Sequence, residues 1–281
     1  MNRLSQLIEV KNRNEGILSC STAPNGAHNY YNLLHDVHVL VKGGIDQLLL
    51  IFSQEPTMRV ASIAPAEVKA VRRGVKDGNY IDAFFDSAKA IRKEFPDLPI
   101  VVSGIVPDII AYGMGRFIKG LEDAGVDAID FPVYQCVKDP YGLAEAVNNS
   151  TLSYIPPVNA GFIDMSLKEN LEYARKQINI ARNGEIFLVP GVSGSTDGLK
   201  GENFVESVKF MKQEIAKQKY NCPIIAIGGV ATAKDANEMV CVAGCDGVHF
   251  SSAYLNKIEA NMPDEEMISW LRSVKEAMKR K

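Results

Sequence analysis

The feature that most constrains the fold is a series of short apolar runs, each followed by turn-forming residues and then by a helical pattern. Runs rich in Ile, Leu and Val are typical of strands buried in a parallel sheet. We predict eight such strands, over the ranges Gly16–Thr22, Gln47–Phe52, Pro99–Ser103, Ala128–Pro132, Leu152–Val158, Glu185–Pro190, Pro223–Ile227 and Gly247–Phe250.

Helical spacing of apolar residues fills the segments around these strands. The predicted helices are Asn2–Asn12, Asn29–Lys42, Pro65–Arg73, Ile81–Phe95, Asp108–Asp123, Tyr141–Asn148, Ser166–Ala181, Phe204–Gln218, Thr232–Val242, Ala253–Ile258 and Pro263–Arg280. Capping-box patterns at Ser166–Glu169 and Thr232–Asp235 mark two of the helix starts. Alternating strands and helices imply a parallel sheet, and eight units favour a closed (β/α)8 TIM barrel. No linker interrupts the pattern, so we expect a single domain over residues 1–281.

Composition excludes several functional classes. The net charge of −3 provides no basic field, which argues against nucleic acid or an anionic membrane as a partner. There is no signal-peptide pattern and no apolar run long enough to cross a bilayer. Five cysteines without a CxxC pair suit reduced thiols, so we expect a cytoplasmic protein. The four histidines show no metal-ligand spacing, and we predict no metal site.

Small residues follow the last two predicted strands. Gly228 and Gly229 follow the seventh strand, and Ser251 and Ser252 follow the eighth. Small residues let backbone amides approach a ligand, and the start of the next helix attracts an anion. Barrels of this class often hold a phosphate after their seventh and eighth strands. We therefore predict a phosphate site at these four residues; the alternative is two ordinary strand-to-helix turns.

A further motif, Gly191-Val192-Ser193-Gly194, follows the sixth strand. Together with the two strand ends above and the stretch Ala111–Asp127, it resembles the tryptophan synthase alpha subunit family. That family is a (β/α)8 lyase that releases indole from indole-3-glycerol phosphate. The similarity runs along the whole chain and is strong from about residue 96 onward. The resemblance adds Ser193 and Gly194 to the predicted phosphate-binding residues.

The chain departs from the family at its catalytic carboxylates. A gapless pairing places Leu49 where the family has the acid/base glutamate of strand two, and neighbouring pairings place Leu48 or Gln47 there. Arg59 stands at or beside the family's aspartate that binds the indole nitrogen. The resemblance therefore implies an altered acid/base set, and a substrate that need not be indole-3-glycerol phosphate.

Three other carboxylates are candidates for acid/base catalysis. Asp130 lies within the apolar fourth strand, where a charge is expensive to bury unless it is paired or neutral. Glu55 lies in the loop after the second strand, and Glu185 begins the sixth strand, at the end opposite the usual active site. Each of the three also has a structural interpretation. Arg59 is a candidate for binding a second anionic group of the substrate, or else a solvated loop charge.

Cys20 and His249 lie on predicted strands and have polar or reactive side chains. Cys20 on the first strand can face the pocket, although no activating base is placed beside it. His249 alternates with apolar residues of the eighth strand, and we interpret it as a packing residue.

We expect a lyase of the tryptophan synthase alpha type that acts on a small phosphorylated substrate and needs no cofactor. The alternatives are an FMN- or sugar-phosphate-binding barrel of another reaction class, and a non-catalytic ligand-binding subunit. In the family, loops after strands two and three dock a beta subunit. Here those loops, Gln54–Thr57 and Ile105–Asp108, differ from the family pattern, so binding of a conventional beta subunit is doubtful.

Overall fold

A parallel sheet forms the centre of the molecule in the computed structural model, which describes residues 3–10, 14–22, 30–53, 65–76, 81–131, 139–159, 168–181, 184–189 and 202–280. Its strand order is β5-β4-β3-β2-β1-β9-β8-β7-β6. The strands are β1 (Ile17–Thr22), β2 (Gln47–Phe52), β3 (Ile100–Gly104), β4 (Ala128–Asp130), β5 (Ser153–Ile155), β6 (Pro157–Asn159), β7 (Ile186–Val189), β8 (Ile224–Ile227) and β9 (Gly247–Phe250).

The fifth predicted strand, Leu152–Val158, is divided at Pro156 in the structure. Proline has no backbone N–H to donate to a neighbouring strand, which interrupts the pairing. The first piece, β5, pairs with β4, and the second piece, β6, pairs with β7. These two strands are opposite edges of the sheet order, yet only Pro156 separates them along the chain. The sheet thus returns on itself, and the predicted (β/α)8 barrel is confirmed.

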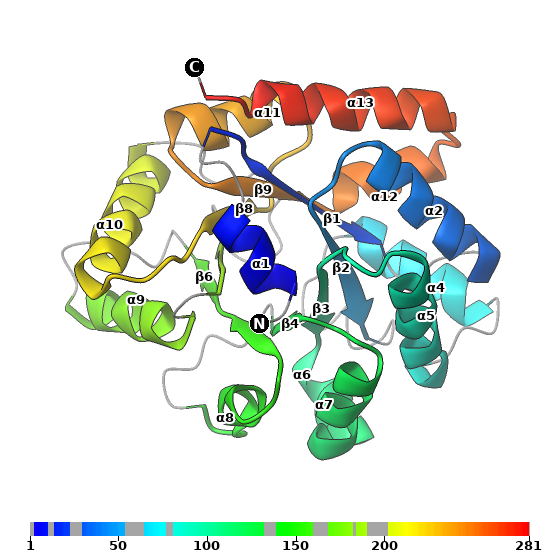
Figure 1. Cartoon of the computed structure of the whole chain (residues 1–281), viewed down its shortest axis with the longest axis horizontal. Coiled ribbons are helices and arrows are strands. Elements are labelled where there is room, and N and C mark those ends of the chain that lie inside the picture. The colour runs from blue at the N-terminus through cyan, green and yellow to red at the C-terminus, as the bar shows by residue number, and fades with distance from the viewer. Residues whose placement is uncertain are drawn as a thin grey trace.

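Helices surround the ring of strands, and α1 lies over its centre in the view of Figure 1. The helices are α1 (Arg3–Val10), α2 (Tyr30–Lys42), α4 (Pro65–Lys76), α5 (Ile81–Glu94), α6 (Val106–Tyr112), α7 (Met114–Asp123), α8 (Leu143–Asn148), α9 (Lys168–Ala181), α10 (Glu202–Gln218), α11 (Ala233–Asn237), the π-helix η3 (Glu238–Val242), α12 (Ser252–Glu259) and α13 (Asp264–Ala277).

Two predicted helices are each divided in the structure. The predicted helix Asp108–Asp123 is two helices, α6 and α7, because Gly113 between them has a φ of 98°, outside the helical range. The predicted helix Thr232–Val242 changes from α-helix to π-helix at Glu238. Its predicted capping box is confirmed: the Thr232 hydroxyl accepts from the Asp235 amide at 3.1 Å, and the Asp235 carboxylate accepts from the Thr232 amide at 2.9 Å.

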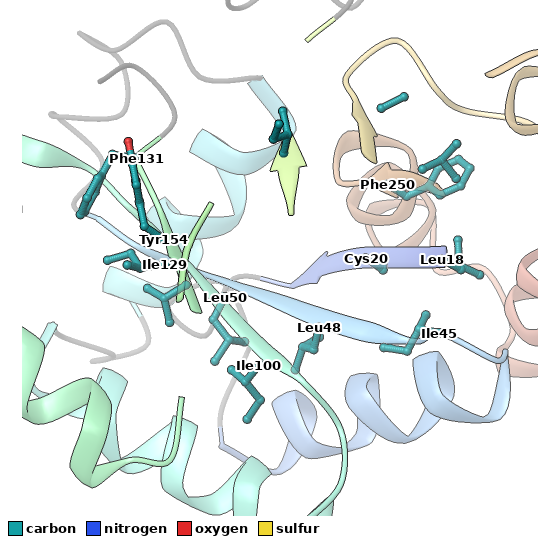
Figure 2. Close-up of a cluster of buried hydrophobic side chains, with 14 of the residues drawn as sticks. Leu18, Cys20, Ile45, Leu48, Leu50, Ile100, Ile129, Phe131, Tyr154 and Phe250 are labelled. Atoms are coloured by element: carbon teal, nitrogen blue, oxygen red, sulfur yellow. The ribbon is translucent and has the colours of Figure 1, made fainter. Parts of the chain in front are cut away.

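Strand side chains alternate between the outside and the inside of the barrel. The outer set packs under the surrounding helices. Figure 2 shows Leu48, Leu50 and Ile100 of this set, which are fully buried. The inner set fills the barrel itself and consists of Leu4, Ile8, Ile17, Leu49, Ile51, Ala66, Ala70, Val71, Val101, Ala128, Ile155, Phe187, Ile225 and Leu255.

The inner cluster runs from α1 at one end of the barrel to α4 at the other. At the N-terminal ends of the strands, the backbone amide of Arg3 on α1 donates to Asp127, the residue before β4. At the C-terminal ends, the hydroxyl of Ser251, just after β9, donates to Glu67 on α4. Both helices contribute apolar side chains to the cluster, so each covers one end of the barrel.

A repeated carboxylate contact fixes three pairs of strands at their N-terminal ends. In each, a Gly-apolar-Asp segment precedes a strand, and the aspartate accepts the amide of the neighbouring strand. The bonds join Asp46 to Leu18 (2.7 Å), Asp127 to Ile100 (2.9 Å) and Asp246 to Ile224 (3.0 Å). Each carboxylate also has a basic partner: Lys275 for Asp46, Arg92 for Asp127 and Lys212 for Asp246. Electrostatic contacts therefore hold these neighbouring strands together in addition to the apolar interior.

Candidate active site

The C-terminal ends of the parallel strands all lie on one face of the barrel, where enzymes of this fold carry their active sites. Among the described residues, Asp130 ends β4, Gly228 and Gly229 follow β8, and Ser251 follows β9. The fold therefore brings one predicted acid/base residue and four predicted phosphate-binding residues, Gly228, Gly229, Ser251 and Ser252, to the same face.

Asp130 is buried inside the barrel, with 1% of its surface exposed. It lies two residues after Ala128 of the inner cluster, and side chains two apart on a strand face the same side. Ser103, its register partner on β3, hydrogen bonds to the carboxyl group. The other oxygen, Oδ1, has no hydrogen-bond partner among the described residues. A ligand that binds next to such a buried oxygen atom can supply the hydrogen bond that the oxygen lacks.

The pKa of Asp130 is raised to about 7, chiefly by burial; the hydrogen bond from Ser103 lowers it, and the nearby charge of Glu67 raises it. A carboxyl group with this pKa can either donate or accept a proton near neutral pH. The chemistry available to Asp130 is therefore general acid/base catalysis.

The two small-residue strand ends are neighbours. Strands β8 and β9 pair in register, with Ile227 opposite His249, so Gly228 and Ser251 follow adjacent strands. Gly228 and Gly229 have φ values of 94° and 68°, a left-handed conformation that favours glycine. Helix α12 begins at Ser252, and only Ser251 separates it from the end of β9. The geometry fits a strand-to-helix anion site of the predicted kind.

Glu67 was not predicted as a site residue, yet it reaches this face from α4. Its carboxylate accepts a hydrogen bond from the Ser251 hydroxyl. Sequence reasoning does not single it out, because a glutamate in the first turn of a helix usually faces solvent and interacts with the helix dipole. One local feature could have pointed to it. Glu67 lies next to Ala66, and the spacing of Ala66 and Ala70 places both on the apolar face of α4.

Glu185 lies at the opposite end of the barrel from Asp130. It directly precedes β7, is fully buried, and accepts a hydrogen bond at 3.1 Å from the Gln47 side chain at the start of β2. The pKa of Glu185 is raised to about 8, chiefly by burial; the hydrogen bond from Gln47 lowers it, and the charge of Asp46 raises it. Glu185 therefore lies at the N-terminal face, whereas Asp130 and the small residues after β8 and β9 lie at the C-terminal face.

Leu49, which stands at the family's acid/base glutamate in the gapless pairing, lies inside the barrel with 3% of its surface exposed. Leu48, from the neighbouring pairing, belongs to the outer cluster instead. The interior position at this level of β2 is therefore apolar, and no carboxylate replaces the family's glutamate on the same strand.

Cys20 does not face the pocket, which corrects the sequence-based expectation. Strand alternation places it in the outer cluster, between the inward-facing positions of Ser19 and Ser21. Burial raises its pKa well above the ordinary value, so the thiol stays protonated. His249 is buried and bonded to the Ser19 hydroxyl at 2.8 Å, and burial lowers its pKa to about 3, so the ring is neutral.

Four predicted site residues, Glu55, Arg59, Ser193 and Gly194, lie outside the described residues. Within the described part of the chain, no group of three or more His, Cys, Asp or Glu side chains is placed to hold a metal ion. No helix in that part is both long and apolar enough to cross a membrane.

Fold and site together define a (β/α)8 barrel with a buried carboxyl group, Asp130, inside its C-terminal face. Residues 22–281 match the family model described as tryptophan synthase alpha chain. The chain therefore belongs to the tryptophan synthase alpha chain family.

Individual relatives agree with this assignment. A tryptophan synthase alpha chain from Bacillus cereus is 26% identical over 212 residues, which cover 75% of this chain and 76% of the relative. The alpha chain structure from Legionella pneumophila superposes with a TM-score of 0.77 at 21% identity, over 99% of this chain and 97% of that one. A structure from Aquifex aeolicus gives a TM-score of 0.82 at 20% identity, with full coverage of both chains. At these identities the structures establish the fold.

Proposed function

We propose that this chain is a lyase of the tryptophan synthase alpha type that acts on a small phosphorylated substrate with an altered acid/base set. Family membership supports the reaction class, and the position of Asp130 supports the acid/base part. The observation that carries the proposal is the buried Oδ1 of Asp130 at the C-terminal face, which has no hydrogen-bond partner in the part of the chain that the structure describes.

Asp130 is the proposed acid/base residue. A carbon–carbon lyase must remove a proton from one part of the substrate and deliver one to the leaving carbon, and each transfer contributes roughly 10²- to 10⁴-fold. The pKa of about 7 lets Asp130 serve in either direction at neutral pH. Ser103 holds the carboxyl group in one orientation, which leaves Oδ1 to meet the substrate. Glu55 remains a proposed second carboxylate from the loop after β2.

The substrate phosphate is proposed to bind where β8 and β9 end. Backbone amides near the start of α12 favour a negative charge, and the glycines after β8 let their backbone approach it. The proposed phosphate-binding residues are Ser193, Gly194, Gly228, Gly229, Ser251 and Ser252. Arg59 is proposed to bind a second anionic group of the substrate. No cofactor is required by this scheme.

The substrate is proposed to differ from indole-3-glycerol phosphate. Leu49 is an apolar part of the barrel interior and cannot exchange a proton with an indole ring. Arg59, which has the opposite charge, stands at or beside the position of the family's second carboxylate.

A search for metabolites that co-purify with the protein tests the proposal. Extracts of purified protein would be compared by mass spectrometry with extracts of the Gly229→Asp variant. We expect a phosphorylated small molecule that is enriched in the wild type, and cleavage of it by the wild type. The Asp130→Asn variant should bind it and turn it over at least about 100-fold more slowly. Undiminished turnover by Asp130→Asn would remove Asp130 from the mechanism, and an FMN-containing extract would replace the lyase proposal.

A further inference from the structure

The contact between Ser251 and Glu67 stands where the ligand phosphate is proposed to bind. Ser251 is the residue before α12, and its side chain makes no capping hydrogen bond to that helix. Instead, its hydroxyl donates to the carboxylate of Glu67 on α4. The two residues are 184 positions apart in the sequence, so the contact belongs to the tertiary fold.

Helix α4 is held in place by packing on its apolar side. Ala66, Ala70 and Val71 belong to the inner cluster of the barrel, together with Leu255 of α12. Glu67 is therefore presented to Ser251 by a helix that covers the barrel mouth. The charge of Glu67 also raises the pKa of Asp130, the candidate acid/base residue.

A carboxylate at this point has the same chemistry as a ligand anion. The first turn of a helix favours a negative charge, and the Ser251 hydroxyl donates to it. Two negative groups cannot share these donors, because like charges in contact repel strongly in a partly buried site. A phosphate that binds Ser251 must therefore displace Glu67.

We propose that Glu67 occupies the anion position in the ligand-free chain and competes there with any anion that binds Ser251; this rests on the proposed phosphate site. A free inorganic anion offers only its charge, which Glu67 opposes. A phosphate ester also contacts the barrel interior through its organic part, and those contacts offset the displacement of Glu67. Displacement of Glu67 lowers the affinity for every anion by the same factor, so free phosphate and sulfate, which have no further contacts, are kept out while a phosphate ester still binds.

Calorimetric titration with sodium sulfate and with glycerol 3-phosphate tests this competition. The proteins are the wild type, Glu67→Gln and the control Glu145→Gln, which makes the same charge change at an exposed residue of α8. Wild type should bind glycerol 3-phosphate at least about tenfold more tightly than sulfate. Glu67→Gln should gain about tenfold or more in sulfate affinity, while Glu145→Gln stays within about twofold of the wild type.

Hydrogen exchange gives a second readout that needs no variant. Binding of glycerol 3-phosphate to the wild type should speed amide exchange in residues 65–76, because α4 loses its contact with Ser251. Equal sulfate affinity in wild type and Glu67→Gln, or unchanged exchange in α4 on binding, would overturn the role of Glu67 and leave the phosphate site standing. Failure of every protein to bind either compound would overturn both.

Discussion

Two carboxyl groups illustrate how position decides the role of a buried acid in this barrel. Asp130 and Glu185 both have raised pKa values, of about 7 and about 8, chiefly because of burial. Asp130 lies at the C-terminal face, where this fold carries its chemistry. Glu185 lies at the N-terminal face beside Gln47, and each of these two side chains keeps one oxygen without a described partner.

Replacement of Glu185 by Gln should remove part of the pH dependence of stability. The folded chain keeps the Glu185 proton up to about pH 8, whereas the unfolded chain releases it near its ordinary pKa of 4.5. The wild type therefore loses stability as pH rises through this window. Glutamine stays neutral, so at pH 9 the variant should be more stable by on the order of 1–3 kcal/mol.

Urea unfolding of the two proteins at pH 5, 7 and 9 measures this difference, with Glu145→Gln on the exposed face of α8 as the matched control. Parallel pH profiles for wild type and Glu185→Gln would show that Glu185 is ionised in the folded protein.

Leu49 leads to a prediction about the family's own reaction. The purified protein should release indole from indole-3-glycerol phosphate at least about 100-fold more slowly than an ordinary alpha chain, because an apolar residue replaces the proton-transferring glutamate. A spectrophotometric indole assay checks this, and a rate within about tenfold of an ordinary alpha chain would contradict the pairing of Leu49 with that glutamate.

At the scale of elements, the aspartates before β2, β4 and β9 join each strand to its neighbour. Asp127 accepts from the Arg3 amide and the Ile100 amide, and it pairs with the guanidinium of Arg92 at 2.7 Å. It therefore couples the barrel to α1, which covers the N-terminal end of the inner cluster.

Substitution of Asp127 by Ala should destabilise the protein by about 3–5 kcal/mol, because it leaves the Ile100 amide and Arg92 without their buried acceptor. The control Asp123→Ala removes an exposed carboxylate that pairs with Lys119 on the same helix, and should cost less than about 1 kcal/mol. Chemical denaturation of both variants measures the difference, and equal losses would show that the buried contact adds nothing.

Local signals explain which elements could be predicted. The Thr232 capping box depends on residues three positions apart, so the sequence alone indicates it, and the structure confirms it. The break at Gly113 could not be placed, because glycine accepts both helical and left-handed conformations and the packing around it selects one. The contact of Glu67 with Ser251 joins distant segments and has no local signature.

At the scale of the whole molecule, strand periodicity was sufficient to predict a barrel. Strands that are apolar on both faces must be covered by helices on the outside of the sheet. Eight strands that alternate with helices are typical of a closed barrel, which buries the other face in its interior. The sequence could not show how the ends are covered, because the α1 and α4 side chains join the inner cluster through long-range contacts.

The surface that would meet a beta subunit includes the segment after β3. The segment after β3, at Ile105 and Val106, is nearly fully buried, and Asp108 accepts a hydrogen bond from Ser53 at 2.9 Å. The segment is thus bound into this chain, and we predict weak or no binding to a conventional tryptophan synthase beta subunit. Size-exclusion chromatography of a mixture checks this, and stable co-elution would contradict it.

The central claim is that the ends of β8 and β9 bind the phosphate of a small molecule. Calorimetric titration with glycerol 3-phosphate of the wild type, Gly229→Asp and the control Gly44→Asp tests it most directly. Both glycines have positive φ values, of 68° and 90°, so the two variants share the backbone strain. Gly44 precedes β2 at the opposite end of the barrel, and only Gly229→Asp places a like charge at the phosphate.

We predict that Gly229→Asp loses well over about tenfold in affinity, since a side chain there holds the backbone away from the phosphate and adds repulsion. Gly44→Asp should bind like the wild type, and circular dichroism should show all three proteins folded. Equal affinity in Gly229→Asp and wild type, or no binding by the wild type, would contradict the phosphate site.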